Sequence, residues 1–284
     1  MSPTMVTIQA GIRRGGIELR QTFTNFQDLW NYIFLPALFL IIMYFLRGKA
    51  VPGTDFSLSA ATIPSVFGMQ IVFGGLVMVA TILFMEREDG TLLRAKATPN
   101  GMLGYLIGKI VQISGMSMMS VVTILIPGAL IFGGLKLASP GAWFTLIWVL
   151  LLGLVATMPI GAVLGSLFSS PSSLGFIFVP MTGLIAISGI FYPITAFPVW
   201  LQWIGQVFPI YWVGLGMRSA FLPDTLVSVE IGDSWRHLET IGVLGIWAVV
   251  GLVLAPVVLR RMARRESGST VAARREKAMQ RAGW

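Results

Sequence analysis

The longest uncharged stretch of the chain constrains its fold more than any other feature. No residue from Leu137 to Met217 is charged, a run of 81 residues. A stretch of about 18 or more apolar residues is a candidate membrane helix, because about 20 residues of helix span the hydrocarbon core. Charged residues make up 11% of the chain, against about 25% in an ordinary soluble domain. The sequence therefore predicts an all-α integral membrane protein.

Turn residues divide the apolar stretches into six predicted transmembrane helices. Serines and a proline at 169–173 favour a polar turn inside the long run, since serine bonds its own backbone and proline cannot continue a helix. The predicted spans are Leu29–Leu46, Pro64–Met85, Ile110–Leu135, Trp143–Phe168, Leu174–Phe191 and Thr240–Leu259.

Residues 192–217 are too broken by proline to cross, and they are rich in Trp and Tyr, which favour the membrane surface. We expect a short external helix pair here, between spans five and six. One member is an amphipathic helix at Pro198–Phe208 with Gln202 and Gln206 on its wet side.

The distribution of basic residues predicts that both termini are cytoplasmic. With six spans, fifteen Lys and Arg residues fall inside and five outside, which follows the positive-inside rule. Residues 1–28 form a cytoplasmic arm, predicted to carry an amphipathic helix in the membrane surface; a solvated arm is the alternative. Residues 29–259 form the transmembrane domain. Residues 260–284 form a basic cytoplasmic tail suited to anionic lipid headgroups.

The composition leaves little room for catalysis. Cysteine is absent, His237 is the single histidine, and the chain has none of the common hydrolase or metalloprotease motifs. We therefore expect a non-catalytic subunit without a metal or cofactor of its own. The basic residues are scattered in short gaps and at the ends, which disfavours nucleic acid as a partner. The predicted spans carry no charge, which disfavours an ion-coupled carrier.

The densest charge cluster lies in the first predicted cytoplasmic loop. Gly90 permits a turn after the second span, Thr91 is suited to cap a short helix, and Thr98-Pro99 to start another. This pattern favours a rigid projection that another protein grips; an ordinary solvated hairpin is the alternative. The candidate residues are Glu86, Arg87, Glu88, Asp89, Gly90, Thr91, Leu92, Arg94, Thr98 and Pro99.

Two motifs carry a resemblance to a known family. The loop from Glu86 to Leu92, followed by Ala97-Thr98-Pro99 and Gly108-Lys109, resembles that of the type-2 ABC exporter permeases, in their bacterial drug-resistance branch. The turn from Ser188 to Pro193 is also similar to that family, with the pieces Phe197-Pro198, Trp200-Leu201-Gln202 and Phe208–Tyr211 that follow it. The resemblance runs from the amphipathic helix to the last span, except for residues 223–239.

This resemblance implies a permease that pairs with a second copy of itself, or with a related permease, and with two ABC ATPase subunits that bind ATP and magnesium. The coupling loop, residues 86–99, would sit in a groove of the ATPase. A hydrophobic substrate would pass between the permeases, along the first, second and fifth spans. The implied external lid residues are Gly189, Phe191, Tyr192, Pro193, Phe197, Pro198, Trp200 and Leu201.

The leading functional hypothesis is ATP-driven export of a hydrophobic or amphipathic drug or antibiotic from the bacterial cytoplasmic membrane. The alternatives are export of a lipid or lipid-linked polysaccharide by the same fold, an ion-coupled secondary carrier, and a membrane scaffold that transports nothing. The sequence does not identify the substrate, because an uncharged path leaves no charge pattern to interpret.

Overall fold

The computed structural model describes residues 3–51, 53–88, 90–97, 100–167 and 175–265. The regular structure of these residues is helical, apart from one isolated bridge between Ala50 and Ser57. In chain order the elements are α1 (Pro3–Thr24), α2 (Phe26–Phe45), α3 (Leu58–Phe73), the π-helix η1 (Gly74–Met78), α4 (Val79–Glu88), α5 (Thr91–Lys96), α6 (Gly101–Phe132), α7 (Pro140–Leu167), α8 (Gly175–Ile187), the 3-10 helix η3 (Ile194–Ala196), α9 (Val199–Val207), α10 (Pro209–Phe221), the 3-10 helices η4 (Asp224–Val229) and η5 (Ile231–Asp233), and α11 (His237–Arg265).

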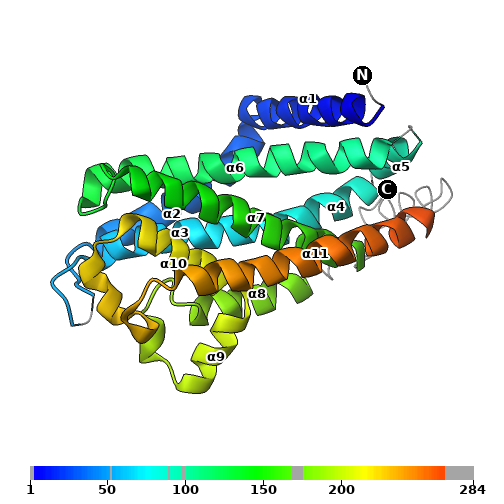
Figure 1. Cartoon of the computed structure of the whole chain (residues 1–284). Coiled ribbons are helices and arrows are strands. Elements are labelled where there is room, and N and C mark those ends of the chain that lie inside the picture. Colours follow the sequence, from blue (N-terminus) through cyan, green and yellow to red (C-terminus); the bar gives the residue numbers. More distant parts are fainter. Residues whose placement is uncertain (1–2, 52, 89, 98–99, 168–174, 266–284) are drawn as a thin grey trace, which may run out of the picture.

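The long helices run side by side along the molecule, and α11 ends near α5, at the end where α1 begins (Figure 1). Four helical segments of the described chain are long and apolar enough to cross a membrane, namely Leu58–Arg87, Gly101–Phe132, Pro140–Leu167 and His237–Leu259. They contain most of the second, third, fourth and sixth predicted spans.

Shorter apolar helical segments lie in the first and fifth predicted spans, namely Pro36–Phe45, which is the second half of α2, and Gly175–Ile187. A helix of 13 residues such as α8 rises about 20 Å, less than the hydrocarbon core of about 30 Å. The polar turn expected at 169–173 lies outside the described residues. The structure thus shows four of the six expected crossings at full length, and the six-span arrangement stays a prediction.

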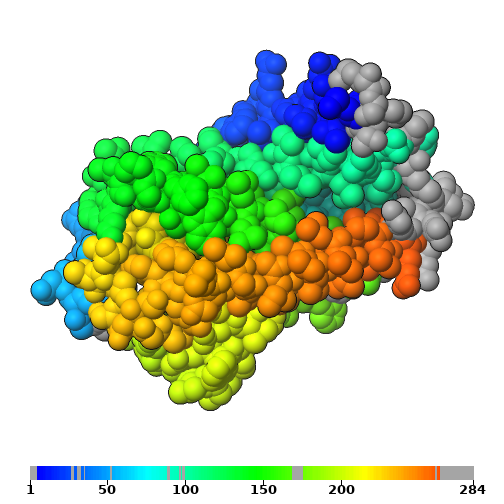
Figure 2. Space-filling model, viewed as in Figure 1, coloured from blue at the N-terminus to red at the C-terminus, as the bar shows by residue number. Residues whose placement is uncertain are grey.

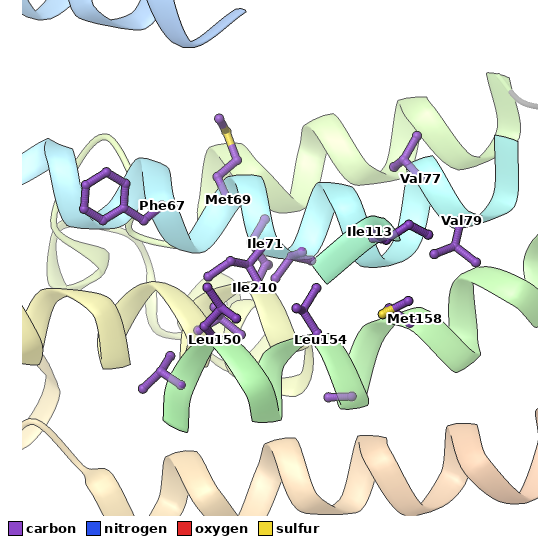
Figure 3. Close-up of a cluster of buried hydrophobic side chains, with 14 of the residues drawn as sticks. Phe67, Met69, Ile71, Val77, Val79, Ile113, Leu150, Leu154, Met158 and Ile210 are labelled. Carbon is purple, nitrogen blue, oxygen red and sulfur yellow. The ribbon is translucent and has the colours of Figure 1, made fainter. Parts of the chain in front are cut away.

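The core forms around the continuous helix α3–η1–α4, which packs against α6, α7 and α10. Leu150, Leu154 and Met158 of α7 face this helix, which presents Ile71 and Val79 among others (Figure 3). Small residues let the two helices approach closely. A Cβ atom at Gly165 would lie 2.6 Å from the Ala80 carbonyl oxygen, and Gly161 abuts the Gly75 and Leu76 carbonyls. The small-residue pair Gly161 and Gly165 therefore packs within one subunit.

The N-terminal helix α1 lies lengthwise on the first half of α6 (Figure 1). Glycines form the contact: a Cβ atom at Gly11 would lie 2.7 Å from the Gly104 carbonyl oxygen, and Gly15 abuts Gly108. Apolar side chains such as Ile12, 49% exposed, point outward. The cytoplasmic arm with a helix in the membrane surface stays a prediction, and the structure shows this helix packed along the first half of α6. Glycines on both helices make this close packing possible.

The region between α8 and α11 differs from the expected pair of interfacial helices. The amphipathic helix is confirmed as α9, but its orientation was predicted wrongly. Trp200 and Trp203 are 63% and 68% exposed, whereas Gln202 donates to the Phe197 carbonyl and Gln206 accepts from Arg236. The glutamines thus form hydrogen bonds with partly buried backbone and side-chain groups, and the aromatic face points outward. Figure 2 shows α9 projecting from the body of the molecule.

The helix that follows α9, α10, is buried in the core. Almost all of its residues are buried, and it packs between α3 and α7. A Cβ atom at Gly68 of α3 would lie 2.6 Å from the Cα atom of Gly214, and one at Gly216 would lie 2.8 Å from Val149. Glycines at these contacts let α10 enter the core despite its aromatic residues.

Candidate functional site

The coupling loop forms a short helix at one end of the molecule. Gly90 has a positive φ of 79° and precedes α5, so the expected glycine turn and short helix are confirmed. Gly90 itself, not Thr91, occupies the N-cap position. Leu92 is 1% exposed and packs into the chain's own core, while Arg94 is exposed and donates to the Thr91 hydroxyl at 3.0 Å.

Four of the expected loop residues lie wholly or partly outside the described part of the chain. The side chain of Glu88 and the residues Asp89, Thr98 and Pro99 lie outside the described part. The helix α6 that follows has Asn100 in the N-cap position, with a positive φ of 54°. The chain therefore turns sharply on both sides of α5, at Gly90 and at Asn100.

Arg87 attaches the base of the loop to α7. Its side chain is buried, and Nη1 donates to the carbonyl oxygens of Ser166 at 3.1 Å and Gly165 at 3.5 Å. These carbonyls belong to the last turn of α7, where a cation is favoured by the helix dipole and by unpaired acceptors. Arg87 thus stabilises the fold directly beside the loop.

Glu86 is part of an ionic cluster that also includes α1 and α6. The ammonium of Lys109 lies 2.6 Å from a carboxylate oxygen of Glu86 and 2.6 Å from one of Glu18. Arg14 donates to Glu18 at 2.7 Å. Glu86 is one of the residues expected in a projection that another protein grips, but its side chain is only 14% exposed, because α6 brings Lys109 over it.

The cluster favours the charged form of Glu18. Burial opposes ionisation, but the hydrogen bonds from Lys109 and Arg14 outweigh it and lower the pKa of this carboxyl. Lys109 was named from the sequence only in the pair Gly108-Lys109, and the cluster was not predicted because its members lie far apart in the chain.

A second buried ion pair fixes the start of the external lid segment, residues 189–201. Arg218 of α10 donates to both carboxylate oxygens of Glu230, at 2.6 and 3.2 Å. It also donates to the Gly189 carbonyl and to the Ser65 hydroxyl, each at 3.2 Å. Gly189 has a positive φ of 73°, which only glycine adopts readily. The expected turn is therefore held by Arg218, which is one of the five basic residues that the predicted topology places outside.

The lid residues are only partly brought together. Phe191 stacks on Phe39 of α2 with ring centroids 5.9 Å apart, and Tyr192 meets Phe197 edge to face at 6.4 Å. Pro198 occupies the N-cap position of α9. Pro193 precedes η3, and Trp200 and Leu201 lie on α9.

Two apolar cavities lie among the helices. One of about 280 Å³ is bounded by α7, α8 and α11, and its lining includes Phe176, Met181, Phe208 and Trp247. The other, of about 260 Å³, lies between α6, α7 and α11. Among the residues of α8, only Ile177 and Met181 are buried, so most of this helix lies at the surface beside the first cavity.

The described residues contain no group of three or more His, Cys, Asp or Glu that could hold a metal ion. Their long apolar helices and largely apolar cavities are those of a helical membrane protein. The sequence model of the ABC-2 family transporter protein matches residues 49–256, which is most of the chain. This chain belongs to the ABC-2 transporter family. It is a membrane subunit of an ABC exporter, and works with an ABC ATPase as a homodimer or heterodimer. A comparison with curated proteins gives no match.

Proposed function

We propose that the chain is the permease of a bacterial exporter that moves a hydrophobic or amphipathic compound, such as a drug or antibiotic, out of the cell. The observation that carries this proposal is the cavity of about 280 Å³ beside α8, whose lining residues are all uncharged. Aromatic and Met side chains in such a lining accept varied apolar shapes.

Coupling to ATP hydrolysis is assigned to the loop between α4 and α6. The buried residues Leu92 and Ala95 attach α5 to the permease, while Arg94 is exposed. Arg87 and Glu86 fix its base to α7 and α6. The sequence places Glu88 and Asp89 between this base and Gly90. A short helix held firmly at its base is suited to transmit a push from an ATPase as a rigid body.

The external lid segment is assigned to gating on the opposite side. Pro193 and Pro198 fix the backbone around η3, since proline restricts φ and lacks a donor. The exposed Trp200 on α9 and the stacked Phe191 are apolar groups suited to exclude water above an uncharged path. The proposal includes a second permease, two ATPases that bind ATP and magnesium, and cytoplasmic termini, which the distribution of basic residues supports.

The test is ATP-dependent transport by the permease reconstituted with its ATPase. Inside-out proteoliposomes should accumulate a neutral fluorescent hydrophobic compound when ATP and magnesium are supplied. The Glu88→Ala, Asp89→Ala double variant should insert normally and lose this transport, whereas Asp55→Ala, on the loop between α2 and α3, should retain it.

Other outcomes would contradict the proposal. Uptake driven by an ion gradient without ATP would identify a secondary carrier. ATP hydrolysis by the complex that is stimulated only by a lipid-linked glycan would identify a polysaccharide exporter of the same fold. Full transport by the double variant would remove the coupling role of the two carboxylates.

A further inference from the structure

From the ionic cluster we infer that Lys109 is a positioning residue that joins the coupling loop to the N-terminal helices. Through this joint, α1 and α2 act as a lever between the ATPase side and the external lid segment. The inference rests on the proposed function, because it assigns how movement of the loop reaches the other side of the permease.

Lys109 holds three helices together with one ammonium group. It contacts Glu86 of α4 and Glu18 of α1, each at 2.6 Å, and it belongs to α6 itself. Its side chain is 10% exposed, so water screens these contacts less than at an open surface. Glu86 lies in the last turn of α4, just before α5. Any displacement of α5 therefore acts on Lys109 through a single helical turn.

Lys109 is the cation in direct contact with Glu86. The second carboxylate oxygen of Glu86 is buried and accepts no hydrogen bond from the described residues. Glu18, by contrast, also accepts from Arg14. Loss of the Lys109 charge removes the one ion pair of Glu86 among the described residues and leaves it the more distant charge of Arg14, while Glu18 keeps its direct hydrogen bond from Arg14. The joint to α4 is thus more sensitive to Lys109 than the joint to α1.

Close packing at the same turn makes α1 follow α6. Gly15 abuts Gly108, the residue before Lys109, and a Cβ atom at Gly115 would lie 3.1 Å from a methyl group of Leu19. At the contact between Gly15 and Gly108 the two backbones touch directly, so α1 has little room to move relative to α6. The ionic contact and the glycine contact therefore move as one unit.

The displacement continues into α2 because the two helices are almost continuous. Only Asn25 separates them, and its N–H donates to the Gln21 carbonyl at 2.9 Å while its carbonyl accepts from Leu29 at 3.0 Å. Farther along α2, Phe39 stacks on Phe191 of the lid segment. A contiguous set of contacts thus leads from α5 to the lid, as mechanical coupling requires.

The absence of cysteine provides a direct test. A Tyr192→Cys variant places one thiol in the lid segment, where the native side chain is 48% exposed. Its labelling rate with a membrane-impermeant maleimide is measured in the complex, without nucleotide and with ATP trapped on a hydrolysis-deficient ATPase. The same measurement is repeated with Lys109→Met, with Lys109→Arg and with Lys136→Met, a control that removes an ion pair to Asp224.

The lever predicts that ATP changes the labelling rate in the parent and in the Lys109→Arg and Lys136→Met proteins. Lys109→Met should bind the ATPase and hydrolyse ATP, yet show no ATP-dependent change in labelling. It should also transport about tenfold fewer molecules per ATP. Should Lys109→Met not fold, Glu86→Gln removes the same charge pair with little change in shape and should give the same result.

An unchanged ATP response in Lys109→Met, or in Glu86→Gln if the first variant does not fold, would overturn the inference. Failure of the proposed function is a separate result, because it would show as a parent complex that transports nothing with ATP. A Lys109→Met protein that loses ATPase binding altogether would also overturn it, since the lysine would then serve assembly of the complex and not transmission.

Discussion

Removal of Glu230 should strongly destabilise the packing of α10 against the lid segment. Glu230 and Arg218 have side chains 7% and 6% exposed and share two charge-assisted hydrogen bonds. In Glu230→Ala the guanidinium keeps only neutral partners, Ser65 and the Gly189 carbonyl. Loss of one partner of a buried ion pair costs about 3–5 kcal/mol. At about 2–4 °C per kcal/mol for a domain of this size, we expect the melting temperature to fall by about 6–20 °C.

The assay is thermal unfolding of the purified protein in detergent, with two matched variants. Glu239→Ala removes the exposed pair with Arg236, whose atoms lie 3.4 Å apart, and it should change the stability by less than about 1 kcal/mol. The double variant Arg218→Met, Glu230→Met removes both charges and should recover much of the loss, because no unpaired charge stays buried. A Glu230→Ala protein as stable as Glu239→Ala would refute the reasoning.

Three further predictions concern the two ends of the permease. Gly15→Leu should detach α1 from α6, because its side chain would meet the Gly108 carbonyl; limited proteolysis of the N-terminal arm should become faster. At pH values above about 4.5, the ordinary pKa of glutamate, ionised Glu18 should hold α1 against α6. This stabilisation should disappear as the pH falls through the lowered pKa of Glu18 in the folded protein. A Glu18→Gln protein should lack that acid-dependent change in proteolysis. Trp200→Ala combined with Leu201→Ala should leak or lose selectivity with normal membrane abundance, as measured by compound efflux and immunoblot; reduced abundance alone would indicate an interfacial anchor.

The sequence was least able to predict which polar groups meet each other. Glu86, Lys109 and Glu18 are separated by many residues, and each has an ordinary surface explanation when considered alone. The same holds for Arg218, which was expected in an external loop and lies in a buried helix. Such pairs depend on how helices pack, and helical periodicity within one segment carries no information about the partner helix.

The external pair of helices shows a second kind of error. Alternation of glutamine and aromatic residues in α9 identified an amphipathic helix, but it did not identify which face meets the protein. In water the aromatic face would turn inward. Here the glutamines find partners in the protein and the tryptophans point outward, as expected where the surroundings are apolar.

The sequence by itself determined the class of protein, because long uncharged apolar stretches can satisfy their backbone only as helices in a membrane. It also determined the turn at Gly90 and the short helix after it, since both depend on local backbone preferences. Tertiary structure alone decided that α10 is buried and that α1 lies on α6. It also decided that Lys109 and Arg218 each form ion pairs with carboxylates from other segments. These features depend on glycine contacts and charge pairs between distant segments, whose energies exist only once the helices have packed.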